Sequence, residues 1–169
     1  MVSVIVILRL IHIVVGAFWV GGATLTAFFL LPTVRATGPL GGQFAGQLLR
    51  RTRLPDWLTG AGLVTVLSGL ILYGKLYSDT TWDGINSGVV FAIGGLVAII
   101  VIVIGFTVSL PTANRMGRIG AAIQNQGSPP TPAQAAEQGQ LLDRMIKVTI
   151  LNSVLLLFTA ACMATARYM

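Results

Sequence analysis

Four long runs of apolar residues dominate the chain, at residues 4–31, 57–77, 88–110 and 148–167. An α-helix needs about 20 mostly apolar residues to cross the hydrocarbon core of a bilayer, because each residue adds about 1.5 Å. Each run supplies about that number, and none alternates strictly between apolar and polar residues as a membrane β-strand does. The pattern predicts an all-α integral membrane protein, a four-helix bundle that forms a single domain over residues 1–169.

The connections between the predicted spans are short and mostly polar. The first is rich in Gly and Gln and predicts a short amphipathic helix over Gly41–Arg51. The last contains the prolines of Ser128–Pro132, which interrupt any helix. We therefore expect residues 124–140 to form a mobile loop before the fourth span.

A short motif is repeated at the ends of the first and third spans, and this internal repeat is here termed the echo. The motif Leu-Pro-Thr stands at residues 31–33 and again at 110–112, an offset of 79 residues, and an arginine follows each copy, at Arg35 and Arg115. The two spans run in the same direction, so the echo favours a duplicated helical hairpin. Because proline is common just after any helix end, chance explains it equally well.

The formal net charge of +6 matters less than where the charges lie. Basic residues gather in the connections between spans one and two and between spans three and four, at Arg35, Arg50, Arg51, Arg53, Arg115, Arg118, Arg144 and Lys147. Loops rich in Lys and Arg stay on the cytoplasmic side. The distribution predicts a multi-pass membrane protein with both termini and the 77–86 connection outside, and it does not resemble a nucleic-acid footprint.

Arg9 and His12 are the strongly polar side chains of the first span, and their spacing of three places them on one helical face. Ionisable groups within a span are costly and usually face the bundle interior, a cavity or a partner. Arg9 lies near the expected outer boundary, where it can extend to the headgroups, and His12 lies about 4 to 5 Å deeper. The same face continues through Gly16, Trp19, Ala23 and Thr26.

Two cofactors suit this face. Cys162 and Met163 of the fourth span lie at a depth comparable to that of His12, and a soft metal such as Cu(I) prefers imidazole, thiol and thioether ligands. Haem b is the other, with His12 on the iron and Arg9 on a propionate. The chain has one histidine, which excludes a bis-histidine haem within one protomer.

Each of these residues also has a simpler role. His12 can hydrogen-bond a neighbouring helix, Arg9 can anchor the interface, and Cys162 can be a small buried apolar residue. The polar stripe of the fourth span, Thr149, Asn152, Ser153 and Thr159, predicts interhelical hydrogen bonds worth about 0.6 kcal/mol each. No nucleophile–base pair, glycine-rich phosphate loop or dinucleotide motif indicates an enzyme.

The stretch Leu8–Gly22, followed by an apolar run and Leu31-Pro32, resembles the opening of helical hairpins in bacterial copper-resistance-D-like membrane proteins and related four-helix families. Their pattern is an early histidine, a spacer, W-x-G-G and a helix that ends at proline. A similar early histidine opens the bacterial membrane protoporphyrinogen oxidase, which binds haem.

This resemblance covers about 30 residues and implies that His12 is a ligand, with Trp19, Gly21 and Gly22 as the accompanying motif. The chain departs from the pattern because it has no second histidine and no Met-rich segment, and it is much shorter than full copper-resistance-D proteins.

Two hypotheses for the function result. One is a small membrane protein that binds haem or copper through His12 near the outer face. The other is a non-catalytic accessory subunit that packs against a larger membrane complex or a second copy.

Overall fold

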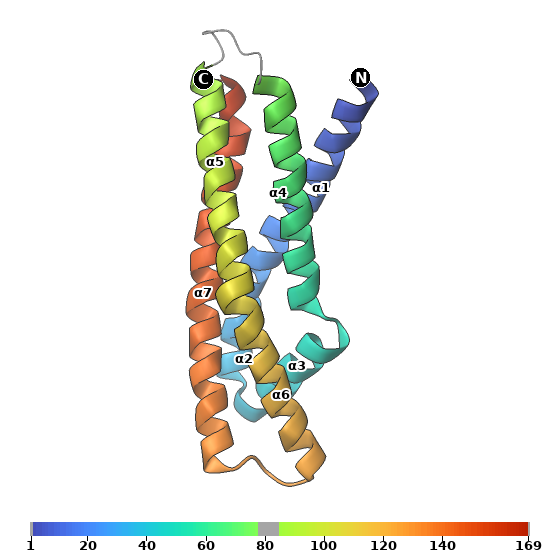
Figure 1. The fold of residues 1–169 in the computed structure, drawn as a ribbon. Helices are drawn as coiled ribbons and strands as arrows, with labels where there is room; N and C mark the ends of the chain where they lie inside the picture. The colour runs from blue at the N-terminus through green and yellow to red at the C-terminus, as the bar shows by residue number, and fades with distance from the viewer. Residues whose placement is uncertain (1, 78–84, 169) are drawn as a thin grey trace.

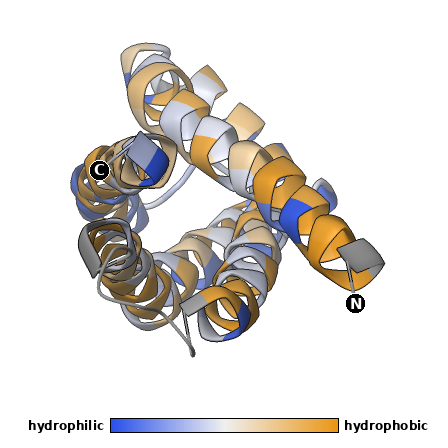
Figure 2. Cartoon of the chain, turned by 90° about the horizontal axis from the view of Figure 1, so that it is seen from above, coloured by the Kyte–Doolittle hydropathy of each residue, from blue (hydrophilic) through white to orange (hydrophobic). Residues whose placement is uncertain are grey.

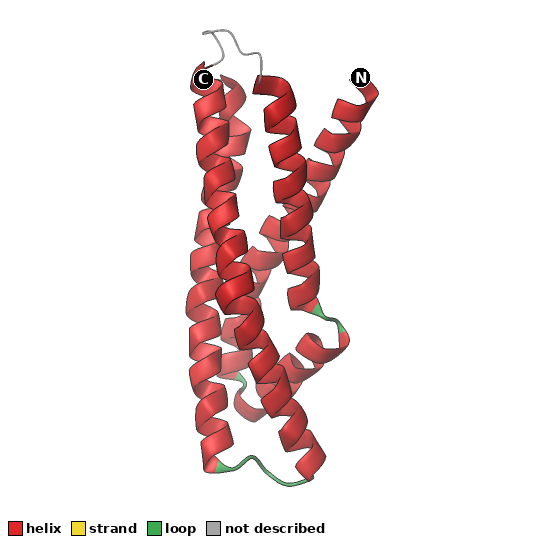
Figure 3. Ribbon diagram, in the orientation of Figure 1, coloured by secondary structure: helices red, strands yellow, loops and turns green. Residues whose placement is uncertain are grey.

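The computed structural model describes residues 2–77 and 85–168, and this part of the chain is helical throughout apart from short connections (Figures 1 and 3). Its α-helices are α1 (Val2–Leu25), α2 (Leu31–Ala36), α3 (Gly38–Arg51), α4 (Leu54–Tyr77), α5 (Ile85–Ile104), α6 (Leu110–Gln126) and α7 (Pro132–Thr165). Four continuous helical stretches are long and apolar enough to cross a membrane. The predicted all-α membrane bundle is therefore confirmed.

The third and fourth helical stretches extend beyond the predicted spans. They cover Ser87–Gln126 and Pro132–Tyr168, so only residues 127–131 separate them. The predicted loop over 124–140 is wrong in extent, because Thr131 caps α7. Its hydroxyl accepts from the Gln134 N–H at 3.2 Å, and the Gln134 side chain accepts from the Thr131 N–H at 2.8 Å. This capping box, with Pro132 in the first turn, starts the helix inside the Gln-rich run.

The first connection is also mostly helical. Helix α3 begins at Gly38, whose φ of +57° suits glycine, and includes the predicted amphipathic helix over Gly41–Arg51. Gly41 lies against the Val34 carbonyl and the Thr37 side chain, so no larger residue fits there. This close approach folds α3 back against α2. The connection that was expected on the outer side falls largely within residues 78–84, outside the described residues.

The sequence echo corresponds to a repeated distortion of the backbone. A π-helical turn occupies Thr26–Leu30, and a second occupies Gly105–Ser109, again 79 residues apart. In each, the residue before proline donates its N–H to the carbonyl five positions back, Leu31 to Thr26 and Leu110 to Gly105. The repeated Leu-Pro-Thr motif and the repeated π-helical turn therefore coincide at both sites.

The centre of the bundle is built from small residues around one large ring. Trp19, Ala23, Ala61, Ala98, Val101 and Leu156 form the main buried cluster. Helix α1 packs along α4, and α5 packs along α7. Towards the N-terminus α1 diverges from the other helices, and its surface there is strongly apolar (Figures 1 and 2). Both described ends of the chain lie at the same end of the bundle (Figure 1).

At the opposite end, two ion pairs join α2 and α6 to α7. Arg35 lies 3.0 Å from Asp143, and Arg115 lies 2.6 Å from Glu137. Both pairs are exposed, so each contributes little to stability. Arg35 and Arg115, which follow the two Leu-Pro-Thr motifs, nevertheless both pair with an acidic residue of α7.

Close packing at Gly62 provides a test of this arrangement. A Cβ on Gly62 would lie 2.5 Å from Ile102 Cδ1 and 2.6 Å from Trp19 Cε2, whereas one on Gly60 meets nothing within 4 Å. We expect Gly62→Ala to lower the free energy of unfolding by about 1–3 kcal/mol through overpacking. Gly60→Ala, the matched control in the same helix, should be neutral or stabilising. Unfolding in mixed micelles followed by circular dichroism measures both, and equal effects would contradict the packing.

Candidate functional site

His12 is half-buried between α1 and α4. Its Nδ1 lies 2.9 Å from the Thr65 carbonyl oxygen and 3.3 Å from Ser68 Oγ. A carbonyl oxygen can only accept, so Nδ1 carries the proton and donates it to Thr65. In a neutral imidazole this leaves the Nε2 lone pair available to a ligand. The arrangement matches metal-binding histidines, in which a backbone carbonyl fixes the tautomer and orients the ring.

Small residues of the two helices make room for the imidazole. A Cβ on Gly69 of α4 would lie 2.8 Å from His12 Cε1, so the ring rests directly on the α4 backbone. One turn further along α1, a Cβ on Gly16 would lie 3.2 Å from Thr65 Cγ2. The Ser68 hydroxyl donates its proton to the Val64 carbonyl at 2.7 Å, so this proton already has a hydrogen-bond acceptor. The ring is therefore held in one orientation.

The face of α1 predicted from the sequence is the face that packs in the structure. Trp19 and Ala23 are buried in the core, while His12 and Gly16 contact α4. Arg9 is exposed one turn before His12. An exposed arginine at this position can reach lipid headgroups or an acidic group of a bound cofactor.

Cys162 and Met163 lie against a different helix from His12. A Cβ on Gly94 of α5 would lie 3.0 Å from Cys162 Cβ and 3.2 Å from Met163 Cε. Within the described residues, no group of three or more His, Cys, Asp or Glu side chains is placed to hold a metal ion. A copper site of His12, Cys162 and Met163 thus stays a prediction, and both sulfur side chains have a packing role.

The polar stripe of α7 is only partly satisfied. Thr159 Oγ1 donates towards the Leu155 carbonyl at 3.0 Å, and it lies 3.4 Å from the Gly94 carbonyl. Asn152 Nδ2 lies 3.5 Å from Ser109 Oγ, a long contact, and Asn152 Oδ1 and Ser153 Oγ are buried without a hydrogen-bond partner. Interhelical hydrogen bonding therefore accounts for only part of this stripe. Asn152 lines a central cavity that sequence reasoning missed.

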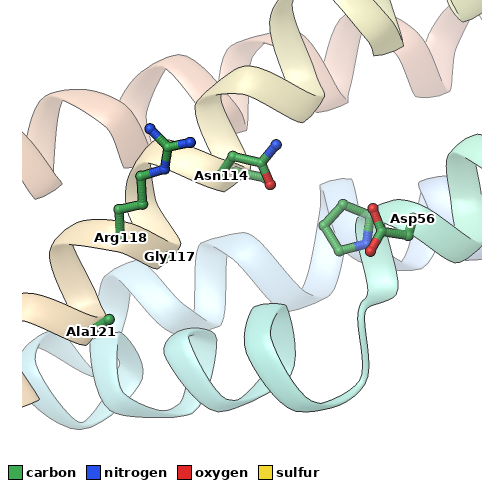
Figure 4. A pocket seen from close by; sticks show the side chains of 7 residues that line it. Asp56, Asn114, Gly117, Arg118 and Ala121 are labelled. Carbon is green, nitrogen blue, oxygen red and sulfur yellow. The ribbon is translucent and has the colours of Figure 1, made fainter.

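A second hollow lies at the end of the bundle where the basic residues gather. It has a volume of about 420 Å³ and is bounded by the start of α4, at Pro55 and Asp56, and by α6, at Asn114, Gly117 and Arg118 (Figure 4). Asp56 accepts a hydrogen bond from Arg53 Nε at 2.9 Å. This cleft is open and polar, with charges of both signs on its walls, and it contains no grouping of residues that favours one ligand.

Comparison of the chain with protein-family models, with curated proteins and with solved structures gives no match. The similarity to copper-resistance-D-like proteins therefore depends on the residues of the first helix alone.

The orientation of His12 gives a direct prediction. Because the Thr65 carbonyl accepts from Nδ1, the neutral ring should be the Nδ1–H tautomer, with Nε2 unprotonated. Nitrogen NMR of protein labelled at its single histidine distinguishes the two tautomers directly. We expect Gly69→Ala, which places a Cβ against the ring, to perturb these signals, while Gly74→Ala, with nothing within 4 Å, should leave them unchanged. A ring protonated at Nε2 and bare at Nδ1 would contradict the assignment.

Proposed function

We propose that this protein is a small multi-pass membrane protein of the copper-resistance-D-like type that binds haem b through Nε2 of His12. The observation that supports this proposal is the hydrogen bond from His12 Nδ1 to the Thr65 carbonyl at 2.9 Å. It fixes the orientation of the imidazole, as second-sphere partners of ligating histidines do. Bound haem would supply one-electron redox chemistry or reversible ligand binding at iron.

The donor groups near His12 support haem over copper. A Cu(I) ion needs several soft ligands together, and Cys162 and Met163 pack beside Gly94 of α5. Haem needs only one imidazole from the chain on its proximal side. Arg9, exposed one turn from His12, supplies a cation for a propionate. Any second histidine ligand would have to come from another protein chain, because this chain has one histidine.

Substitutions at three places test the haem proposal against the copper alternative. His12→Ala should abolish the Soret absorption of protein purified gently from its own membrane, because it removes the iron ligand. Arg9→Ala should retain the Soret band but bind haem several-fold more weakly, because it removes only a propionate partner. Cys162→Ala and Met163→Leu should leave the spectrum unchanged.

Helix content by circular dichroism serves as the control, since one ring contributes little to the apolar spans. Wild-type protein with no chromophore would refute the haem proposal. Stoichiometric copper that is lost in Cys162→Ala or Met163→Leu would favour the copper site instead.

The alternative function, an accessory subunit of a larger membrane complex, has its own supporting observation. The N-terminal half of α1 diverges from the bundle, and large apolar residues there are exposed, among them Leu10 and Ile13 at 62% and 64%. Lipid can cover such a surface as well as a neighbouring helix can. Co-purification of one stoichiometric membrane partner, lost when Leu10 and Ile13 are replaced by alanine, would favour the subunit function.

The proposed placement in the bacterial cytoplasmic membrane makes a prediction about topology. The basic residues of α6 and α7, including Arg118 and Arg144, should lie in the cytoplasm and both termini outside. A reporter fused after Met169 should behave as periplasmic or extracellular, and one inserted near Gln126 as cytoplasmic. The reverse pattern would overturn the orientation but not the four-helix fold.

A further inference from the structure

The polar cleft at the basic end of the bundle and the central cavity lie next to each other. Pro55, at the start of α4, lines both spaces. Its two neighbours divide between them, because Asp56 lines the cleft and Leu54 lines the cavity. Neither space on its own favours one ligand. Together they place a polar region beside an apolar one, which is the arrangement that an amphipathic molecule requires.

Trp57 indicates where the two spaces lie in the bilayer. It follows Asp56 directly, is 66% exposed, and begins the apolar run of α4. Tryptophans of membrane helices concentrate at the boundary between the hydrocarbon core and the headgroups. The cleft therefore lies at headgroup level. The cavity extends from there towards the hydrocarbon core, because its wall reaches Trp19 and Leu156 in the centre of the bundle.

One face of α6 forms a wall of the polar cleft, opposite the start of α4 (Figure 4). The lining residues of this face are Asn114, Gly117, Arg118 and Ala121. They are separated by three, one and three positions, which places them on the same side of a helix. A Cβ on Gly117 would meet nothing within 4 Å, so the space beside Arg118 is open to a ligand. The Arg118 guanidinium and the Asn114 amide both offer N–H donors there.

The charges around the cleft favour an anion. Asp56 already pairs with Arg53, whose Nε lies 2.9 Å from Asp56 Oδ2. Arg118 takes part in none of the ion pairs among the described residues. The cleft is therefore left with one positive charge that has no partner. A guanidinium binds phosphate oxygens well, and basic pockets between membrane helices hold acidic lipid headgroups.

The central cavity suits part of an acyl chain. Its volume is about 120 Å³, and most of its wall is apolar, with Leu30 and Leu110 among the lining residues. An engineered apolar cavity of about 150 Å³ takes up benzene, so this space has room for a few methylene groups. We propose that the two spaces together bind one anionic phospholipid of the bilayer. Its phosphate lies at Arg118 and Asn114, and part of one acyl chain passes Pro55 into the cavity. This site is separate from His12 and does not depend on haem binding.

Native mass spectrometry of the delipidated full chain in detergent measures this binding. Phosphatidylglycerol and phosphatidylcholine with identical acyl chains compare an anionic headgroup with a neutral one. We expect saturable binding of a single phosphatidylglycerol, about fivefold tighter than that of phosphatidylcholine. Arg118→Gln should abolish this preference. Arg144→Gln, which removes another exposed arginine at the same end but outside the cleft, should retain it.

A second pair of variants tests the acyl-chain part of the site. Gly105 lines the cavity and Gly95 does not, and a Cβ on either would meet nothing within 4 Å. Gly105→Leu should fill the cavity and weaken both lipids several-fold, while Gly95→Leu should change neither. Helix content by circular dichroism shows that each variant is folded.

Several outcomes would overturn the proposal. Equal affinity for the two lipids, or a preference that survives Arg118→Gln, would remove the evidence for an anionic headgroup. Tighter binding of phosphatidylethanolamine than of phosphatidylglycerol would assign the cleft to a zwitterionic lipid, with its ammonium group at Asp56. Displacement of the lipid by glycerol 3-phosphate, which has no acyl chain, would indicate a soluble phosphate ligand instead. Unchanged lipid binding in Gly105→Leu would show that the cavity takes no part.

Discussion

Backbone hydrogen bonding within the apolar spans constrains this fold more than any other interaction. Inside a bilayer no water is available for a peptide N–H or carbonyl group, so each must find a partner in the protein. Pro32 and Pro111 each lack an N–H, and a proline ring clashes with the carbonyl four residues back. At both sites the backbone accommodates the proline with a π-helical turn that ends just before it. The helix continues past the proline without a break.

The π-helical turns also shape the interior. A π turn inserts one extra residue, which shifts the following side chains around the helix axis. Residues of both turns line the central cavity, together with Trp19 and the buried amide of Asn152. Packing is close at Gly62, where a Cβ would meet Trp19 and Ile102. Residues of the two distorted turns thus form part of the cavity wall.

The sequence predicts the helices well because their signal is strong and local. Runs of about 20 apolar residues identify a span by themselves, and the face from His12 to Thr26 follows from helical periodicity. The π turns were not predicted, since Leu-Pro is read as an ordinary helix end. The start of α7 was placed too late because Gln-rich sequence resembles a loop, while the capping box between Thr131 and Gln134 is a local signal of four residues.

The sequence likewise predicts some features of the site residues and not others. That His12 faces a neighbouring helix could be predicted, because its spacing to Trp19 fixes the face. Which helix it contacts, and that Nδ1 donates to the Thr65 carbonyl, depend on how α1 crosses α4, and one sequence does not contain that angle. The comparable depth of Cys162 and Met163 was an inference about height in the membrane alone. It carried no information on direction around the bundle, where the two side chains lie against Gly94.

Trp19 connects the two regions of the molecule. It lies seven residues after His12 on the same face of α1, about 10 Å along the helix axis. Its ring packs against Gly62 and Ile102, and it also borders the cavity that contains Asn152. A change in the packing of α1 on α4 would therefore affect both the support of His12 and the wall of the cavity. The close approaches at Gly62 and Gly69 of α4 depend on the absence of a side chain, so these glycines matter to the position of His12 as well as to the stability of the bundle.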